Sequence, residues 1–236
     1  MTRLILKMSG EAIGDTTSEA PIDDQRLRAF VNGVAGALST NPDIELGIVV
    51  GGGNIVRGRD LPGTPAQYAD QMGMLGTVIN GLALRAGLEA VGLECRLMSS
   101  IGMRSVAEPY KHAGCRSHLS KKRVVVLAGG LGLQYFTTDT AATHRAVDVA
   151  ADELLLAKFG TDSIYDSDPN VNFDAKKLVE VTGSEVLDRK LQVMDLTAIA
   201  FCMENRLPVY VFDMDEEDAV QQSLLGDRKA GSRIVH

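Results

Sequence analysis

A glycine run with an arginine nearby is the first of three stretches in this sequence that could bind phosphate. Gly51, Gly52 and Gly53 follow the apolar residues 48–50, which predict the end of a buried strand, and Arg57 stands four positions after the run. Glycine has no Cβ, so a ligand can approach the backbone closely. Successive N–H groups in such a turn form a concave anion site, and the forked guanidinium suits phosphate. A tight turn beside a solvated arginine explains the same residues equally well.

A second glycine-rich turn, at 129–132, follows another apolar run at 124–128 and leads into hydroxyl residues. Thr137, Thr138 and Asp139 stand just before a segment with helical periodicity. Hydroxyl and amide donors at a helix N-terminus suit phosphate. The same residue types are also ordinary helix caps. Two such loops in one chain favour the phosphate interpretation more than either loop alone.

Lys7 and Asp70 are the other charged residues placed where chemistry could occur. Lys7 lies at the end of a predicted strand and directly precedes Met8, Ser9 and Gly10. There it could face a phosphate, although a single lysine is more often a surface charge. Asp70 lies near the start of a predicted helix, where the helix dipole favours a carboxylate whatever its function.

The elements that must position these residues follow from the spacing of the apolar side chains. Predicted strands lie at 3–8, 44–50, 94–98, 124–128, 153–157 and 208–212, and predicted helices begin near 24, 68, 140, 182 and 195. Strand, helix and strand in succession imply an α/β fold with a parallel sheet. The carboxyl ends of parallel strands lie at one edge, where ligands bind in open α/β folds. Residues 106–120 are polar and basic without a clear pattern, and we interpret them as a connecting helix and loop.

Composition limits the classes of function. The chain has 236 residues, of which 45% are apolar. Its formal net charge of −7 argues against general binding to nucleic acid or a membrane surface, which favours clustered positive charge. Three widely spaced cysteines favour reduced thiols of a cytoplasmic protein. The N-terminal apolar run is too short for a signal peptide, and no apolar stretch approaches the roughly 18 residues of a membrane span.

Five acidic residues within 213–218 invite a metal-site hypothesis. Acidic residues also favour the start of a helix, and we interpret this run as the opening of the last helix. We therefore predict no metal site made of protein side chains alone.

Seven motifs in this order and approximate spacing resemble those of bacterial UMP kinases, which belong to the amino acid kinase superfamily. They are Lys7–Glu11, Gly51–Gly58, Asp70–Met74, Asn80–Ala83, Phe136–Asp139, Tyr165–Pro169 and Val193–Asp195. The similarity extends from Leu4 to Ile234. Three glycines alone would be a weak signal, but Asp70–Met74 together with Phe136–Asp139 is specific to this branch. The Walker pattern GxxxxGK[ST] of other nucleoside monophosphate kinases is absent from the sequence.

The resemblance implies a three-layer αβα sandwich with a mainly parallel central sheet. It implies one domain over 1–236, with the acceptor nucleotide held roughly by 1–150 and ATP roughly by 151–236. The implied activity is transfer of the γ-phosphoryl group of ATP to UMP, with Mg²⁺ accompanying the ATP and no nucleic-acid partner.

The resemblance also assigns residues to the two substrates and to catalysis. The positions implied for ATP are Lys7, Met8, Ser9, Gly10, Gly53, Arg57, Phe159, Tyr165 and Asp168. Those implied for UMP are Gly52, Asp70, Leu131, Gly132, Leu133, Gln134, Tyr135, Phe136, Thr137 and Thr138. Those implied for catalysis are Lys7, Arg57 and Asp139, where Asp139 orients Lys7 or the magnesium bound to the phosphates.

Two other functions stay open at this point. A storage protein related to these kinases binds ATP and holds metal oxyanions. Leu131 and Leu133, which stand where the family commonly has polar residues, would suit such a change. A kinase of another small phosphate or carboxylate acceptor is the second alternative. Lys7, Arg57 and Asp70 all remain, which favours a kinase.

The helix predicted at 68–91 is apolar nearly all round, so it lies either deep in the core or against another subunit. The resemblance implies a homohexamer built as a trimer of dimers and packed partly through this region.

Overall fold

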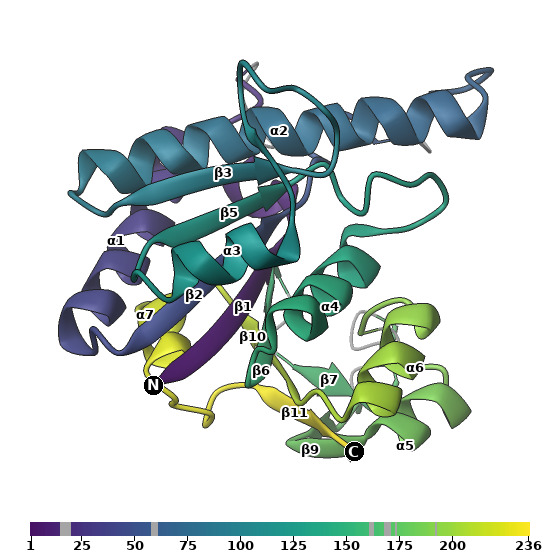
Figure 1. Ribbon diagram of the computed structural model, residues 1–236. Helices are drawn as coiled ribbons and strands as arrows, with labels where there is room; N and C mark the ends of the chain where they lie inside the picture. The colour runs from purple at the N-terminus through teal and green to yellow at the C-terminus, as the bar shows by residue number, and fades with distance from the viewer. Residues whose placement is uncertain (15–19, 58–60, 161–162, 168–170, 173, 192) are drawn as a thin grey trace.

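The computed structural model describes residues 1–236 apart from 15–19, 58–60, 161–162, 168–170, 173 and 192. In the described residues, a nine-stranded sheet has helices on both faces (Figure 1). The strands are β1 (Thr2–Met8), β2 (Ile44–Val50), β3 (Cys95–Ser99), β4 (Glu108–Pro109), β5 (Val124–Ala128), β6 (Glu153–Lys158), β9 (Glu180–Thr182), β10 (Val209–Asp213) and β11 (Ser232–Val235), with a separate hairpin of β7 (Ile164–Tyr165) and β8 (Lys177–Leu178). The helices are η1 (Gly10–Ile13), α1 (Asp24–Thr40), α2 (Ala66–Ala90), α3 (His112–Leu119), α4 (Thr138–Val149), α5 (Gly183–Asp188), α6 (Leu196–Asn205) and α7 (Ala219–Leu224).

Strand β1 lies in the middle of the sheet. The strand order is β4-β3-β5-β2-β1-β6-β10-β11-β9. Strand β1 pairs in parallel with β2 on one side and with β6 on the other. Among the strand pairs described in this sheet, only β10 and β11 run antiparallel. The carboxyl ends of β1, β2, β5, β6 and β10 therefore lie at the same edge.

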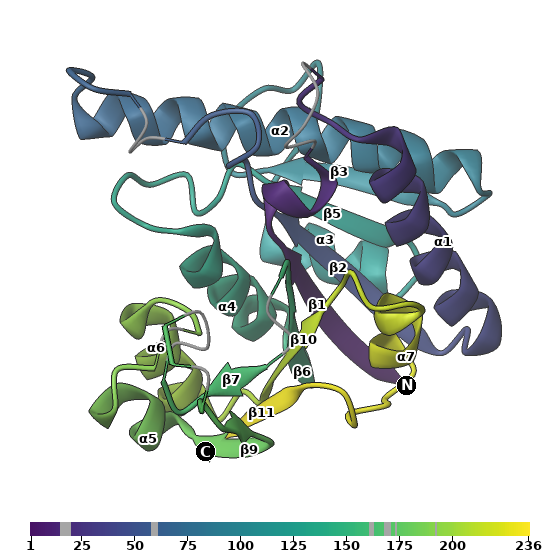
Figure 2. The same cartoon turned by 180° about the vertical axis from the view of Figure 1, so that it is seen from behind.

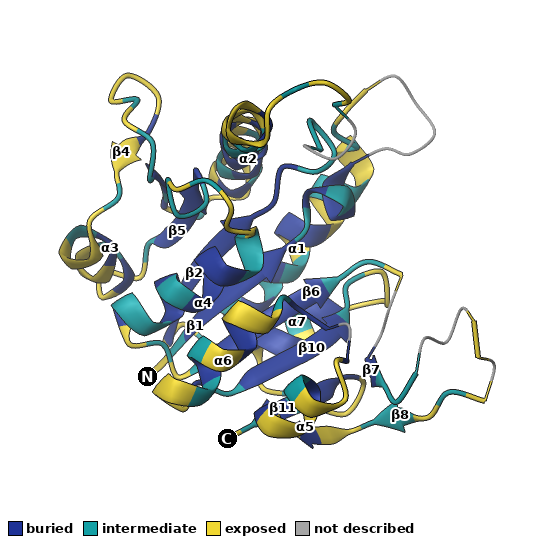
Figure 3. Cartoon of the chain, turned by 90° about the vertical axis from the view of Figure 1, so that its right-hand side faces the viewer, coloured by how far each residue is buried: buried dark blue, intermediate teal, exposed yellow. Residues whose placement is uncertain are grey.

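Successive side chains of each central strand enter opposite apolar layers. In β1, Leu4, Leu6 and Met8 pack with residues of α1, α2 and α7, whereas Ile5 packs with residues of α3, α4 and α6. Figure 2 shows α1 and α7 on the face turned away from the viewer of Figure 1. Burial on both faces explains why these strands have continuous apolar runs (Figure 3). The predicted three-layer α/β sandwich with a mainly parallel sheet is confirmed.

The acidic run at 213–218 does not open a helix, so that interpretation was wrong. Helix α7 begins only at Ala219: Asp213 ends β10, Asp215, Glu216 and Glu217 lie in the turns between, and only Asp218 adjoins the helix, as an N-cap whose side chain makes no capping hydrogen bond. The Asp213 carboxylate accepts a hydrogen bond from the Asp215 N–H at 2.9 Å, a local turn that competes with helix formation. In contrast, the helix predicted to begin near 182 is confirmed as α5, where Thr182 and Glu185 form a capping box.

The segment without a clear pattern, at 106–120, contains the short edge strand β4 and helix α3. Two residues of strand produce no periodicity that a sequence could reveal. The helix is anchored by Cys115 and Leu119, which are both buried. Two basic side chains, of Lys111 at the N-cap and Arg116 within the helix, remain exposed.

All three cysteines are free and buried. Burial raises the pKa of each thiol to about 12, which disfavours the reactive thiolate. None of the helices in the described part of the chain has the length and apolar character needed to cross a membrane.

Candidate functional site

A buried pair of opposite charges lies where β1 ends. Lys7 is the next-to-last residue of β1, and its Nζ lies 2.7 Å from Oδ1 of Asp139 in the first turn of α4. The Lys7 residue is only 7% exposed. Lys158, the last residue of the neighbouring strand β6, is electrostatically coupled to both. Two cations and one carboxylate therefore meet at the carboxyl edge of the sheet.

These three groups perturb one another's protonation. Burial disfavours the charged form of Asp139, but the attraction of Lys7 and Lys158 outweighs it, so the pKa of Asp139 lies below its ordinary value. Burial lowers the pKa of Lys158, Asp139 opposes that shift, and Lys7 reinforces it. The cluster has a net positive charge when both lysines are protonated, which suits a polyanionic ligand.

The first glycine loop follows β2 and is held against β1 and α2. The Gly51 N–H donates to the Met8 carbonyl at 2.9 Å. The buried Asn80 side chain donates to the Gly51 carbonyl at 2.7 Å and exchanges hydrogen bonds with Asn54. A Cβ on Gly52 would lie 2.5 Å from the Gly73 carbonyl oxygen. Only glycine therefore allows this approach of the loop to the helix backbone.

The second glycine loop follows β5 and uses a different property of glycine. Gly129, Gly130 and Gly132 have φ values of 77°, 55° and 78°, which other residues adopt at a cost. The Gly129 N–H donates to the buried hydroxyl of Thr77 in α2 at 2.7 Å. In Figure 1 the connection that continues from this loop passes between α2 and α4.

The second loop ends where α4 begins, at a junction with α6. The Thr137 hydroxyl caps α4 by accepting from the N–H groups of Asp139 and Thr140. The same hydroxyl donates to the Asp195 carboxylate, and the Thr140 hydroxyl donates to it at 3.0 Å. Asp195 also caps α6 through the Ala198 N–H at 2.9 Å.

The two loops enclose a cavity of about 640 Å³, which we call the acceptor cavity. Its lining comes from both glycine loops, η1, the first half of α2 and the start of α4. The lining residues are Glu11, Gly52, Gly53, Val56, Arg57, Thr64, Ala66, Ala69, Asp70, Gly73, Met74, Thr77, Gly130, Leu131, Leu133, Phe136, Thr137 and Thr138. Carboxylate, guanidinium and hydroxyl groups stand among apolar side chains, a combination typical of small-molecule sites.

Arg57 and Asp70 both line this cavity and both have partners. The Arg57 guanidinium pairs with the Glu11 carboxylate and donates from Nε to the Gly53 carbonyl at 3.2 Å. The Asp70 carboxylate accepts from the Tyr135 N–H at 2.7 Å. Gly53 and Arg57, which the resemblance assigns to ATP, therefore line the same cavity as the residues assigned to UMP.

The other predicted residues in the described part of the chain do not line this cavity. The Met8 side chain is fully buried, so the chain offers only its backbone there, next to Ser9 and Gly10. Gly132, Gln134 and Tyr135 belong to the second loop without lining the cavity. The Phe159 ring follows β6, Tyr165 lies in the hairpin strand β7, and Asp168 lies outside the described residues.

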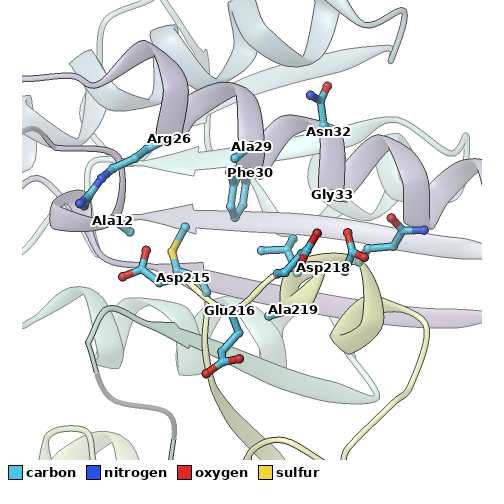
Figure 4. A pocket seen from close by; sticks show the side chains of 14 residues that line it. Ala12, Arg26, Ala29, Phe30, Asn32, Gly33, Asp215, Glu216, Asp218 and Ala219 are labelled. Atoms are coloured by element: carbon cyan, nitrogen blue, oxygen red, sulfur yellow. The ribbon is translucent and has the colours of Figure 1, made fainter.

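A second cavity, of about 390 Å³, lies between α1 and the turns that precede α7 (Figure 4). Asp215, Glu216 and Asp218 line it opposite Arg26. The Arg26 guanidinium also lies over the Phe159 ring, 4.5 Å from its centroid. The acidic lining makes this cavity less suited to phosphate than the acceptor cavity.

Several residues of the site were missed by sequence reasoning. Lys158 ends a central strand as Lys7 does, so its position was a usable signal. Asn80 and Asp195 stand in quoted motifs but had no role assigned, because their partners are distant in sequence. Arg145 in α4, which contacts the second loop, had no signal in the sequence at all.

Comparisons with known proteins agree with this arrangement. Residues 2–213 match the model of the amino acid kinase family. The uridylate kinase of Deinococcus radiodurans is 43% identical over 227 residues, which are 96% of this chain and 92% of that protein. The uridylate kinase of Leifsonia xyli subsp. xyli is also 43% identical, over 226 residues that are 95% of this chain and 93% of that protein.

Solved structures are similar over the same extent. The UMP kinase from Bacillus anthracis has a TM-score of 0.94 and 35% identity, covering 99% of this chain and 96% of that one. The UMP kinase from Ureaplasma parvum has a TM-score of 0.92 and 30% identity, covering 100% and 99%. The resemblance inferred from the motifs is thus confirmed, and the chain belongs to the amino acid kinase family.

Proposed function

We propose that this protein is a UMP kinase, which transfers the γ-phosphoryl group of Mg-ATP to UMP and releases ADP and UDP. One observation supports it most. The acceptor cavity is continuous with the first turn of α4, and that turn also contains Asp139, the partner of Lys7. An acceptor in the cavity would thus lie next to the cationic cluster at the strand ends.

The chemistry of the acceptor makes few demands on the protein. A phosphate monoester has a second pKa of about 6, so it is largely a dianion at neutral pH and attacks without a general base. The task is to hold two anions in line and to neutralise the charge of the transferred group. Lys7 and Lys158 supply positive charge, and the amides of the first glycine loop supply hydrogen-bond donors.

Asp139 and Arg57 have different roles in this proposal. Asp139 holds the Lys7 ammonium in place through the 2.7 Å ion pair. Arg57 leaves its pairing with Glu11 and uses its fork to bind a phosphate. Asp70 binds the ribose hydroxyls of UMP once its carboxylate exchanges the Tyr135 N–H for them.

The residues fit a magnesium ion that arrives with the nucleotide rather than one held by protein side chains. No three His, Cys, Asp or Glu side chains of the described residues converge to hold an ion. Asp139 is already paired with Lys7. When bound with ATP, Mg²⁺ would neutralise negative charge on the phosphates.

The proposal also says which half of the chain holds each nucleotide. We propose that UMP is held mainly by residues 1–150 and ATP mainly by 151–236, with Phe159, Tyr165 and Asp168 near the adenosine. Reduced, buried thiols support a place in the cytoplasm, where both nucleotides occur.

The activity is tested by ADP release with UMP, CMP, dUMP or no acceptor. We expect turnover with UMP and none without an acceptor. Leu131 and Leu133 line the cavity without offering side-chain hydrogen bonds to a base. The ratio of kcat/KM for UMP to that for CMP therefore measures how far the site discriminates uracil from cytosine. ATP binding without turnover on any acceptor would contradict a kinase and support the storage alternative.

We also propose a homohexamer, a trimer of dimers. One face of helix α2 packs into the core, whereas an apolar stripe on another face stays exposed. The stripe consists of Tyr68, Met72, Leu75, Ile79 and Leu82, each between 42% and 53% exposed. The spacing places these side chains on one face of the helix, a patch suited to another copy of the chain. Light scattering should give the mass of six chains, and the mass of one chain would refute this.

A further inference from the structure

We infer that Arg145 is a positioning residue for the acceptor, because it fastens the second glycine loop to helix α4. The inference rests on the proposed function, since it concerns the loop that lines the acceptor cavity. Arg145 does not line that cavity itself. It acts through Gly130, which does.

The Arg145 guanidinium is buried behind the loop. The residue is 5% exposed, and its Nη2 donates to the Ser100 hydroxyl at 2.8 Å and to the Gly130 carbonyl at 3.3 Å. The Ser100 hydroxyl donates to the same carbonyl at 2.8 Å. Two donors therefore hold one carbonyl oxygen at the point where the loop turns toward the cavity.

The guanidinium is itself fixed from the opposite side. Its Cζ lies 3.7 Å from the centroid of the Tyr110 ring, and its Nη1 lies 3.3 Å from the Asp148 carboxylate. The Tyr110 hydroxyl donates to the same carboxylate at 2.9 Å. A planar guanidinium can stack and donate in several directions at once, which the ammonium of lysine cannot do.

Both ends of the loop are thereby attached to one helix. The loop begins at Gly130, held by Arg145, and it ends at Thr137, which caps α4 two turns earlier. The residues between these points include Leu131, Leu133 and Phe136 of the cavity lining. Glycines with positive φ do not resist rotation by themselves, so the shape of this lining depends on its attachments, which also include the hydrogen bonds of Gly129 to Thr77 and of Tyr135 to Asp70.

The consequence differs for the two substrates. Loss of the Arg145 contacts removes one of the two buried donors to the Gly130 carbonyl and loosens the start of the loop, which Ser100 and Thr77 still hold. Lys7, Asp139 and Lys158 keep their contacts, because none of these residues touches Arg145 in the described structure. Binding of the acceptor should therefore weaken while binding of ATP stays nearly constant.

The test compares Arg145→Met, Arg145→Lys and Ser100→Ala with Arg3→Met as the matched control. Arg3 is also largely buried, pairs with Glu45 at 2.6 Å and donates to the Val149 carbonyl at the far end of α4. For Arg145→Met we expect the KM for UMP to rise about ten-fold, with the KM for ATP nearly unchanged, since small displacements of positioning groups have effects of this size. Arg145→Lys and Ser100→Ala should produce smaller shifts in the same direction.

A second measurement does not depend on activity. Hydrogen exchange of the amides at 129–137 should become several-fold faster in Arg145→Met, and it should stay unchanged in Arg3→Met although that variant also loses stability. If Arg145→Met does not fold, Arg145→Lys and Ser100→Ala replace it in both measurements.

The outcomes separate this inference from the proposed function. An equal rise in both KM values, an equal effect of Arg3→Met, or unchanged exchange at 129–137 would overturn the role of Arg145. If the wild-type protein releases no ADP with UMP, the proposed function fails, and the exchange experiment alone decides whether Arg145 fastens the loop.

Discussion

The two glycine loops lie at the same edge of the sheet but depend on glycine for different physical reasons. In the first loop the glycines allow close packing, since a Cβ on Gly52 would collide with the backbone of α2. In the second loop Gly129, Gly130 and Gly132 all have positive φ, so they allow a backbone conformation. A Cβ on Gly129 would also lie 2.9 Å from the Ser99 hydroxyl oxygen, and one on Gly132 would lie 3.1 Å from the Ser100 Cβ, so conformation alone decides only at Gly130. A Cβ on Gly130 would be no closer than 3.8 Å to its nearest neighbour, Met74.

This difference shows how the site divides its tasks. The crowded first loop is held by Asn80 and by β1, so it belongs to the rigid frame around Lys7. The second loop, whose glycines have positive φ, is held at its ends by Arg145 and Thr137, and its residues line the acceptor cavity. A side chain added at Gly52 of the first loop should therefore cost stability, and changes in the second loop should mainly affect acceptor binding.

Lys7→Met should have the largest effect, because Lys7 belongs to the charged cluster with Asp139 and Lys158 at the carboxyl edge of the sheet. Loss of a group that stabilises the transferred phosphoryl should lower kcat about 10³-fold. The measurement is ADP release with UMP, and the exposed Lys121 provides the matched control Lys121→Met. Unchanged turnover in Lys7→Met would show that Lys7 takes no part in the mechanism. The position of the two loops relative to Lys7 would then no longer support their role in catalysis.

Asp139→Asn should cost about 3 kcal/mol of unfolding free energy at neutral pH, because it breaks a buried ion pair and leaves Lys7 and Lys158 without their counter-ion. The pKa of Asp139 is lower in the folded protein than its ordinary value of 3.8. Its charge therefore stabilises the protein fully above that value and ceases to do so as the pH falls through the lower, folded-state pKa.

Urea unfolding of both proteins from pH 7 to pH 2 measures this. The difference in free energy between wild type and Asp139→Asn should be greatest at neutral pH and should shrink at the acidic end. A difference that stays constant over the whole range would contradict the ion-pair explanation.

Gly52→Ala should destabilise the protein by about 2 kcal/mol, because the added methyl group forces the first loop away from α2. The adjacent Gly53→Ala is the matched control, since its Cβ would meet nothing closer than 3.4 Å, the Glu11 carboxylate. Calorimetric Tm values should fall clearly for the first variant and hardly for the second. Equal Tm values would show that the first loop is not crowded.

Gly130→Ala should have the smallest effect on stability, about 1 kcal/mol, which is the usual cost of a left-handed conformation for a residue with a Cβ. Gly130→Asn should cost less, since asparagine tolerates this conformation better. Chemical unfolding of both variants tests the order. A larger loss for asparagine would indicate crowding, as in the first loop, and would remove the distinction between the two loops.

The fold was largely predictable from the sequence, whereas the support of the site was not. Largely apolar runs predicted β1, β2, β5 and β6, because strands buried on both faces carry apolar side chains at most positions; Lys7 and Glu45 are the buried charged exceptions in β1 and β2. The loops themselves were recognisable from glycine and threonine spacing. Whether their glycines served packing or conformation depends on φ values and neighbours that no local pattern encodes.

The supporting residues escaped for a similar reason. Ser100, which contacts Arg145, lies 45 positions away from it, and Asp195 lies 58 positions after Thr137. Arg145 itself stands in a helix with an unremarkable pattern of residues. Only the folded chain shows that these separated positions hold one loop.

Asp195 has a mechanical consequence for such an enzyme. Its single carboxylate joins the first turn of α4 to the first turn of α6. Any relative movement of the two helices that preserves these hydrogen bonds is therefore restricted at this junction.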